Sequence, residues 1–395
     1  MSKVLGIIAE YDPFHLGHRY HLEEALKKTG AEVSAAVISG DFTQRGESAI
    51  VDKWARAEMA VSQGIDLVLE LPFAFACNNA GLFAKGGVEI LEAIGADYIA
   101  FGSETADVEA LLEAAERREH MTPEQHEEIK EYVRKGWSYP RALTEVLGET
   151  EAKGPNDTLA VEYIRNMKSA EPVPILRRGA GHGELLEEEE MASATLIRKK
   201  LLKYGTISSI KDLIPDTTAD ILLRERTRGE FADPESLLNF IQMRAGTASS
   251  EELNNVYGAE EGLGSKLKED FRYADSLEKL IESLKSKRYT RTRIQRVLIH
   301  TLLGATRDDI ISAKPYIRIL AFTEKGAAYL KELKKAGGPA LPLIENIKKD
   351  LAQHPELKDT FSLDLKASDF YNTVYGRDLY MNSEYVKKPL KFMAE

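Results

Sequence analysis

Four apolar segments alternate with helical patterns through the first 104 residues of the chain. The segments are VLGIIAEY, VSAAVISG, DLVLELPF and DYIAFGSE, at residues 4–11, 33–40, 66–73 and 97–104. The helical patterns between them end at Gly30, Gly64 and Gly95, and glycine favours a helix C-terminus. Strands that alternate with helices predict a parallel sheet with right-handed crossovers, and strands that are apolar throughout predict helices on both faces. The expected fold class is therefore α/β, with an N-terminal doubly wound parallel sheet.

The pattern changes after the fourth segment. Residues 106–150 are helical and polar, GPND at 154–157 leads into a further helix, and EPVPILRRG at 171–179 predicts a fifth strand. GHGELLEEEEMAS at 181–193 predicts an acidic loop, and 315–322 is a last strand-like segment in a helical region that begins near 208. The segment from GGPALP (337–342) onward shows no clear pattern. We expect two domains, residues 1–207 and 208–395, the second mainly helical.

The composition restricts the class of protein and the cellular compartment in which it can work. Of the 395 residues, 43% are hydrophobic and 30% are charged, which is typical of a soluble globular protein. No apolar run reaches the length of a membrane span, and the first residues lack the pattern of a secretory signal. The single cysteine, Cys77, excludes an internal disulfide and a cysteine-based zinc cluster. We expect a cytoplasmic protein without a membrane partner; the sequence does not indicate its oligomeric state.

Two histidines, His15 and His18, flank Gly17 after the first predicted strand and at the start of the first predicted helix. Parallel sheets bind ligands at the C-terminal ends of their strands, and a helix N-terminus offers free N–H groups and partial positive charge to an anion. The pattern therefore favours a phosphate site. Two alternatives stay open: ordinary histidines at a helix start, and a metal site that adds His21. No carboxylate pattern of a zinc motif accompanies the histidines, so we expect no metal ligands.

The SATLIRK motif at 193–199 is a second helix start suited to an anion, with Ser193 and Thr195 as candidate caps. Arg198 could reach phosphates from the side opposite the two histidines. Together the two motifs are similar to the paired signatures of the HIGH-type nucleotidyltransferase superfamily. Members of that superfamily catalyse the attack of a substrate on the α-phosphorus of ATP, with release of pyrophosphate.

Longer motifs make the resemblance more specific. They are EYDPFHLGHRYH, SGDFTQRGESAIVDKWARAEMAVSQGIDLVLELPF, FGSE, GPND, SATLIRK, KRYTRTRIQR and PYIRILAFTEKG. In this order they resemble the bacterial tRNA(Met) cytidine acetate ligase family over nearly the whole chain. The resemblance implies a nucleotidyltransferase-like, Rossmann-type ATP-binding domain that activates acetate as acetyl-adenylate, with Mg²⁺ and without coenzyme A. It also implies acetylation of N4 of the wobble cytidine of elongator tRNA(Met), giving N4-acetylcytidine.

The same resemblance implies an ATP site, to which the second helix start adds Ser193 and Thr195. The implied residues are Ile7, Ile8, Ala9, Glu10, Tyr11, Asp12, Pro13, Phe14, His15, Leu16, Gly17, His18, Arg19, Tyr20, Gly102, Asn156, Arg177 and Arg178. We expect His15, His18 and Arg198 to be catalytic, since they can stabilise charge that develops on the phosphates.

Three aspartates depart from the family pattern. Asp12 stands where the family usually has Asn, Asp157 where a second Asn is common, and Asp41 where Asn or His is more usual. A carboxylate at Asp12 beside a triphosphate costs binding energy unless Mg²⁺ or an arginine offsets it. These departures do not change the enzyme class that the resemblance implies; they affect the detailed geometry of the expected ATP site.

The formal net charge of −11 argues weakly against a nucleic acid partner, but residues 285–307 carry seven basic residues and no acidic one. Basic residues with an interleaved aromatic side chain, here Tyr289, suit an RNA backbone and a splayed base. We predict that tRNA contacts Lys287, Arg288, Arg291, Arg293 and Arg296. The alternative is a solvated helix face.

On a helix, positions 288, 291, 295 and 296 share much of one face, and Arg293 points elsewhere. Arg293 should therefore contribute least to RNA binding, or have a structural partner.

The DKWARAEMA motif at 52–60 supports two interpretations. Lys53 and Arg56 could line a path for acetate or tRNA, and Trp54 and Met59 could equally be core anchors.

Two other functions stay open at this point. A small-molecule adenylyltransferase that makes a coenzyme precursor would share the histidine pair but would have no use for the basic segment. A non-catalytic RNA-binding protein with a vestigial nucleotide fold would tolerate the loss of His18 and would release no pyrophosphate.

Overall fold

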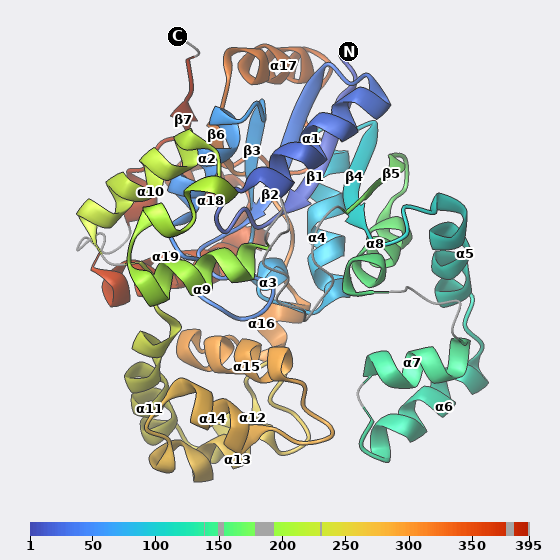
Figure 1. Ribbon diagram of the computed structural model, residues 1–395. Coiled ribbons are helices and arrows are strands. Elements are labelled where there is room, and N and C mark those ends of the chain that lie inside the picture. Colours follow the sequence, from blue (N-terminus) through green and yellow to red (C-terminus); the bar gives the residue numbers. More distant parts are fainter. Residues whose placement is uncertain (138, 149–153, 178–192, 230, 377–382, 394–395) are drawn as a thin grey trace.

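A single mixed sheet forms the centre of the molecule (Figure 1). The computed structural model describes residues 1–137, 139–148, 154–177, 193–229, 231–376 and 383–393. The strands are β1 (Val4–Ala9), β2 (Val33–Ser39), β3 (Leu67–Leu71), β4 (Tyr98–Ser103), β5 (Glu171–Leu176), β6 (Ile319–Phe322) and β7 (Leu390–Lys391). They lie in the order β5-β4-β1-β2-β3-β6-β7, and β1 to β5 are parallel. The predicted α/β class and the first five strands are confirmed.

Helices cover the sheet and extend beyond its C-terminal edge. In the first half they are α1 (Leu16–Thr29), α2 (Lys53–Ser62), α3 (Phe73–Ala76), α4 (Ala80–Ala93), α5 (Val108–Glu119), α6 (Pro123–Arg134), α7 (Tyr139–Leu147), α8 (Pro155–Asn166), α9 (Ala194–Tyr204) and α10 (Asp216–Arg228). The rest are α11 (Leu238–Thr247), α12 (Ser250–Asn254), α13 (Leu263–Asp270), α14 (Leu277–Leu284), α15 (Arg291–Leu303), α16 (Arg307–Ile311), α17 (Glu324–Lys335), α18 (Ile347–Gln353) and α19 (Lys358–Tyr375). No helix in the described parts is long and apolar enough to cross a membrane.

The strands are apolar throughout because both faces of the sheet are covered. In β1, Ile8 packs in the same core cluster as Leu91 of α4, whereas Ile7 packs in a second cluster with Leu22 of α1. Successive side chains of a strand point to opposite faces, so β1 supplies both clusters.

The strand order places a ligand site. The chain proceeds from β1 to β2 and β3 on one side, and then returns to β4 and β5 on the other side of β1. The order therefore reverses between β1 and β4. Ligands of open α/β sheets bind at the C-terminal ends of the strands at such a switch point.

The last third of the chain completes the sheet. The predicted strand at 315–322 is present as β6, which pairs antiparallel with β3, and β7 pairs parallel with β6. The segment from 337 onward, which had no clear pattern, contains α18, α19 and β7. The acidic loop expected at 181–193 lies outside the described residues except for Ser193. The division at residue 207 stays a prediction, and any C-terminal domain would share the sheet with the N-terminal one.

A buried ion cluster joins α2 to this C-terminal region. Lys53 Nζ lies 2.6 Å from Glu70 Oε1 and 3.1 Å from Glu384 Oε2, and Arg318 Nη2 lies 2.6 Å from the same Glu384 oxygen. None of these four side chains is more than 5% exposed. Trp54 Nε1 also donates a hydrogen bond to Glu384. Lys53 is therefore a structural residue and does not line a path for acetate or tRNA.

Arg56 is likewise a buried structural residue. Its guanidinium donates to the carbonyl oxygens of Glu10 at 2.7 Å and Ser39 at 3.0 Å, and also to those of Gly40 and Val51. Because the carbonyls of Glu10, Ser39 and Gly40 lie at or just beyond the ends of β1 and β2, Arg56 fixes the two strand ends relative to each other. Of the two interpretations of the DKWARAEMA motif, the structure supports packing.

Asp364 on α19 makes the stability of the fold depend on pH. Its carboxylate accepts hydrogen bonds from Phe73 N–H and Tyr316 O–H, and burial, reinforced by the charge of Glu70, raises the pKa of Asp364 to about 7. Because the folded state holds this proton more tightly than the unfolded state, the stabilisation is fully present below about pH 3.8 and is lost progressively up to about pH 7.

We therefore expect the contribution of Asp364 to the free energy of unfolding to fall between about pH 4 and pH 7, and Asp364→Asn to remove that contribution. Urea unfolding of both proteins at several pH values measures the difference. Parallel profiles for the two proteins would contradict the assignment.

Candidate active site

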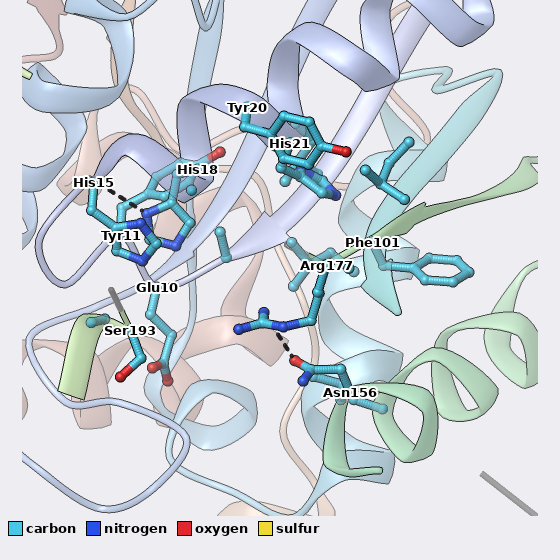
Figure 2. Close-up of a pocket in the computed structure, with 18 of the residues that line it drawn as sticks. Glu10, Tyr11, His15, His18, Tyr20, His21, Phe101, Asn156, Arg177 and Ser193 are labelled. Atoms are coloured by element: carbon cyan, nitrogen blue, oxygen red, sulfur yellow. Dashed lines mark hydrogen bonds between the residues drawn. The ribbon is translucent and has the colours of Figure 1, made fainter. Parts of the chain in front are cut away.

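A cavity of about 230 Å³ lies at the switch point between β1 and β4 (Figure 2). Its lining comes from the C-terminal ends of β1, β4 and β5 and from the starts of α1, α8 and α9. Of the expected ATP-site residues it includes Ile7, Ile8, Ala9, Glu10, Tyr11, Asp12, His15, Gly17, His18, Tyr20, Gly102, Asn156, Arg177 and Ser193. Residues far apart in the sequence therefore meet where the sheet topology places a ligand.

Some expected residues lie outside the lining. Pro13 and Phe14 are buried in the turn before α1, Leu16 and Thr195 are half-buried in the first turns of α1 and α9, and Arg19 is exposed. Arg178 lies outside the described residues. His21, considered from the sequence only as a possible metal ligand, also lines the cavity, and sequence reasoning missed Phe101, Leu159, Tyr163, Ile175, Leu176 and Ala194. Most of these are apolar, and in the sequence they are indistinguishable from ordinary core positions.

The two imidazoles of the HLGH motif are stacked. The ring centroids of His15 and His18 are 3.7 Å apart with an interplanar angle of 22°, and the backbone N–H of His15 donates to His18 Nδ1 at 3.3 Å. Gly17 makes room for this arrangement, because a Cβ there would lie 2.9 Å from His15 Cε1. An Nδ1 that accepts a hydrogen bond leaves the proton of a neutral imidazole on Nε2. His18 can therefore donate from Nε2.

Both imidazoles are neutral at physiological pH. Burial is the main cause: it lowers the pKa of His15 to about 3, and it lowers the pKa of His18 well below its ordinary value. The positive charge of Arg177 lowers both further. The pair consequently acts through neutral hydrogen bonds.

Two buried nitrogens of the cavity lack partners. Within the described part of the chain, neither His15 Nδ1 nor His21 Nε2 has a hydrogen-bond partner. Buried polar groups are normally hydrogen-bonded, so these atoms favour a polar ligand in the cavity. No group of three or more His, Cys, Asp or Glu residues in the described segments is placed to hold a metal ion.

Arg177 and Asn156 face the histidines from across the cavity (Figure 2). Arg177 Nη1 donates to Asn156 Oδ1 at 3.4 Å, and Asn156 Nδ2 donates to Glu104 at 2.6 Å. Gly102 lies beneath the arginine, where a Cβ would come within 3.2 Å of Arg177 Cγ. The cation at this end of the cavity is thus held in place and is exposed to a ligand.

Arg198 is held beside the cavity by two carboxylates. Its Nη1 lies 3.0 Å from the Asp12 carbonyl oxygen and 3.4 Å from Asp12 Oδ2, and its Nη2 donates to Glu47 Oε2 at 3.1 Å. Ser193 caps α9 by accepting from Leu196 N–H. An arginine therefore offsets the Asp12 charge, as the sequence argument required. Contact of Arg198 with phosphates stays a prediction.

The other two departures from the family pattern lie outside the cavity lining. The Asp41 carboxylate accepts hydrogen bonds from the backbone N–H of Lys53 at 2.9 Å and from the Ser368 hydroxyl at 2.7 Å. Asp157 accepts from Glu104 N–H at 3.0 Å and from the hydroxyl of Ser103. Both carboxylates are buried and hydrogen-bonded, so they hold the structure around the site and do not face its ligand.

The basic segment is largely neutralised by acids from elsewhere in the chain. Glu278 binds Arg291 through two hydrogen bonds of 2.5 Å, and Arg293 contacts Glu261 Oε2 at 3.2 Å and the Gly258 carbonyl at 3.2 Å. The structural partner expected for Arg293 is confirmed. Sequence inspection missed these acids because they lie outside residues 285–307.

Two further expectations for this segment are wrong. α15 begins at Arg291, so Arg288 precedes the helix, and Gln295 is buried; the expected shared face does not form. Tyr289 is 7% exposed and donates to the Glu261 carbonyl, so its ring is not free to stack on a base. Lys287 and Arg288 remain exposed, and in the described segments neither has an acidic partner.

The chain is similar to known proteins over nearly its full length. The family model described as HIGH Nucleotidyl Transferase matches residues 2–385. A tRNA(Met) cytidine acetate ligase of Bacillus licheniformis is 37% identical and one of Bacillus subtilis is 34% identical, each alignment covering 99% of this chain and 97% of the relative. The crystal structure of Thermotoga maritima TmcAL bound with alpha-thio ATP is 30% identical, with a TM-score of 0.90 over 99% of this chain and all of that one.

The switch-point cavity, the histidine pair at the start of α1 and the family match define the class as a HIGH nucleotidyl transferase. Within this class, the relatives from Bacillus licheniformis, Caldicellulosiruptor saccharolyticus and Bacillus subtilis share a single name and match over nearly the whole chain. The chain belongs to the tRNA(Met) cytidine acetate ligase family.

Proposed function

We propose that this protein is an ATP-dependent ligase that acetylates N4 of the wobble cytidine of elongator tRNA(Met), giving N4-acetylcytidine. Acetate would first be activated as acetyl-adenylate with release of pyrophosphate. The observation that carries the proposal is a cavity with neutral, stacked His15 and His18 at the start of α1, in a chain that matches this ligase family over its whole length. A small-molecule adenylyltransferase would not need the helical C-terminal half that these relatives share.

The order of the two steps follows from the chemistry of the substrates. The cytidine N4 lone pair is delocalised into the ring, so the amine is a poor nucleophile, and free acetate has no good leaving group. A mixed anhydride with AMP supplies the leaving group, and a fixed geometry places the amine against the carbonyl carbon. Binding and orientation are therefore the main tasks of the protein.

The residues of the cavity suit these tasks. The N–H groups at the start of α1 would bind the phosphates, and Nε2 of His18 would donate to the oxygen on which charge develops. Arg177, and Arg198 if a ligand draws it from Asp12, would balance the charge of the phosphates. Neutral imidazoles need not lose a proton during the reaction, so their donor role would be independent of pH near neutrality.

We further propose that Mg²⁺ accompanies ATP. Glu10 and Asp12 line the cavity with carboxylate oxygens, which Mg²⁺ prefers, and in the described structure Asp12 Oδ2 has no hydrogen-bond partner besides its ion pair with Arg198. Mg²⁺ would offset phosphate charge near these carboxylates. Coenzyme A would not be required, and we place the enzyme in the cytoplasm, where its tRNA substrate is found.

Incubation with ATP, labelled acetate and bulk tRNA, followed by nucleoside analysis, tests the proposal. We expect label in N4-acetylcytidine, dependent on ATP and not supported by acetyl-coenzyme A in place of acetate and ATP. Transfer of AMP to a small molecule would favour the adenylyltransferase, and tRNA binding without pyrophosphate release would favour the non-catalytic alternative.

The helical region, residues 208–395, would bind the tRNA. Within its basic segment, Lys287 and Arg288 are exposed and have no acidic partner in the described segments, so they are the side chains most available to RNA phosphates. We expect Lys287→Ala/Arg288→Ala to weaken tRNA binding and to make its salt dependence shallower, because fewer counterions are released. Arg291→Ala and Arg293→Ala should each have a smaller effect, because both arginines already have acidic partners. tRNA affinity at two salt concentrations measures both effects; an unchanged slope in the double variant would identify a solvated surface.

A further inference from the structure

The QRGE sequence at residues 44–47 forms a turn between the cavity and α15. The N–H of Gly46 donates to the Thr43 carbonyl at 3.0 Å, the N–H of Thr43 donates to the Glu47 carbonyl at 2.9 Å, and Phe42 pairs with Ser48 below. These hydrogen bonds close the turn and leave Gln44 and Arg45 at its tip. Gly46 has a φ of 75°, which favours glycine at this position.

One side of the turn contacts the cavity. The N–H of Gln44 donates to Glu10 Oε1 at 2.8 Å, and Glu47 Oε2 accepts from Arg198 Nη2 at 3.1 Å. Glu10 lines the cavity, and Arg198 is bound to Asp12, which also lines it. The turn is therefore fixed to the wall of the proposed nucleotide site.

The other side of the turn contacts α15. Gln295 Nε2 donates to Glu47 Oε1 at 2.9 Å, and Arg296 Nη1 donates to the Gln44 carbonyl at 3.2 Å. Gly46 fits so closely that a Cβ would lie 2.3 Å from the backbone nitrogen of Arg296. Gln44 and Glu47 each bond to both sides, so the turn connects the nucleotide site to the helix that follows Lys287 and Arg288.

The tip residue, Arg45, has no assigned task. Its side chain is exposed, and in the described segments it has no acidic partner and no hydrogen bond. The backbone N–H of its neighbour Gln44 bonds to Glu10 Oε1, so Arg45 lies beside the cavity wall, and its charge slightly opposes the rise that burial causes in the pKa of Glu10. A fixed turn thus holds an unpaired cation between the cavity and the basic segment.

We propose that Arg45 binds a phosphate of the tRNA beside the target cytidine, and that the surrounding turn positions it for this contact. The inference rests on the proposed function, because the turn joins the cavity, where the base would bind, to α15, the helix that follows Lys287 and Arg288. The ligand chemistry is a phosphate oxygen, which ATP could also supply, so the test must separate the two sources.

The test uses the full chain with Arg45→Ala, Arg45→Lys and Gly46→Ala, and with Arg228→Ala as a control for loss of one exposed arginine at the end of α10. Acetate-dependent exchange of pyrophosphate into ATP, without tRNA, reports on the nucleotide site. The Kd for an unmodified elongator tRNA(Met) transcript, at two salt concentrations, reports on RNA binding. Thermal unfolding checks that each variant is folded.

We expect Arg45→Ala to weaken tRNA binding about tenfold and to reduce the salt slope by about one, with a much smaller change in exchange. Arg45→Lys should restore part of the affinity, and folded Gly46→Ala should bind tRNA weakly although it retains Arg45. Arg228→Ala should resemble wild type. Equal losses in pyrophosphate exchange and tRNA affinity would assign Arg45 to ATP binding and overturn the proposal. Wild-type tRNA affinity in either Arg45→Ala or Gly46→Ala would also overturn it.

The same assays distinguish the two levels of inference. If the wild-type enzyme forms no N4-acetylcytidine, the proposed function fails. If it does and Arg45→Ala acetylates and binds tRNA as wild type does, the role of Arg45 alone fails.

Discussion

His15→Ala and His18→Ala should each reduce acetyl-adenylate formation by roughly a hundredfold or more, the usual effect of removing one fixed donor to transition-state charge. The two rings are stacked at 3.7 Å and both are neutral, so each substitution removes a hydrogen-bonding group without removing a positive charge. Binding of ATP should fall less than turnover, because the charge that the donors meet develops in the transition state. Acetate-dependent pyrophosphate exchange and the Kd for ATP measure the two quantities.

His18→Asn provides a matched control, since an amide retains a donor in a side chain of smaller size. It should recover part of the activity that His18→Ala loses. If the histidine-to-alanine variants lose ATP affinity and turnover equally, the pair only holds substrate. Activity that depends on a histidine titrating near pH 6.5 would also contradict the proposed role of neutral imidazoles, because the pKa of His15 in the folded protein is about 3.

Lys53→Ala should lower the free energy of unfolding by about 3–5 kcal/mol, the range for removal of one partner from a buried ion pair. Lys53 is 1% exposed and lies between Glu70 and Glu384. Burial acts to lower the pKa of this lysine, but the neighbouring carboxylates outweigh it and raise the pKa, so the charge is present throughout the physiological range. Among the residues that the structure describes, its removal leaves buried negative charge that Arg318 alone balances. Urea unfolding at pH 7 measures the loss.

Lys53→Met with Glu384→Gln tests whether charge is the cause. The double variant removes one charge of each sign and keeps similar side-chain volumes, so it should be less unstable than the sum of the two single variants. Additive losses would show that Lys53 and Glu384 stabilise the protein independently, through packing.

The sheet could be predicted from the sequence because its signals are local. The apolar segments at 4–11 and 33–40 and the glycines after the intervening helices depend only on neighbouring residues, and β1, β2 and α1 follow them closely. The position of His15 and His18 after a strand and before a helix was predictable for the same reason. Family motifs then extended the prediction to Gly102, Asn156 and Arg177 across the cavity.

Features that depend on distant residues could not be predicted. The basic segment looked unpaired because its acids, including Glu261 and Glu278, lie in other segments. Lys53 looked available because Glu384, one of its two partners, lies more than 300 residues later in the chain. β6 was recognised as a strand, but no local signal indicated that it pairs antiparallel with β3.

The late position of Glu384 has a consequence for synthesis. Glu70 leaves the ribosome soon after Lys53, but Glu384 follows roughly 15–60 s later at elongation rates of about 5–20 residues per second. Until then the parallel strands can pair, but the nascent sheet lacks the carboxylate that both Lys53 and Arg318 require. A chain released between residues 318 and 384 would retain nearly every residue of the cavity, but Lys53 and Arg318 would share the single carboxylate of Glu70. Translation interrupted in this interval would thus yield products that are less stable, and more open to proteolysis, than chains that include Glu384.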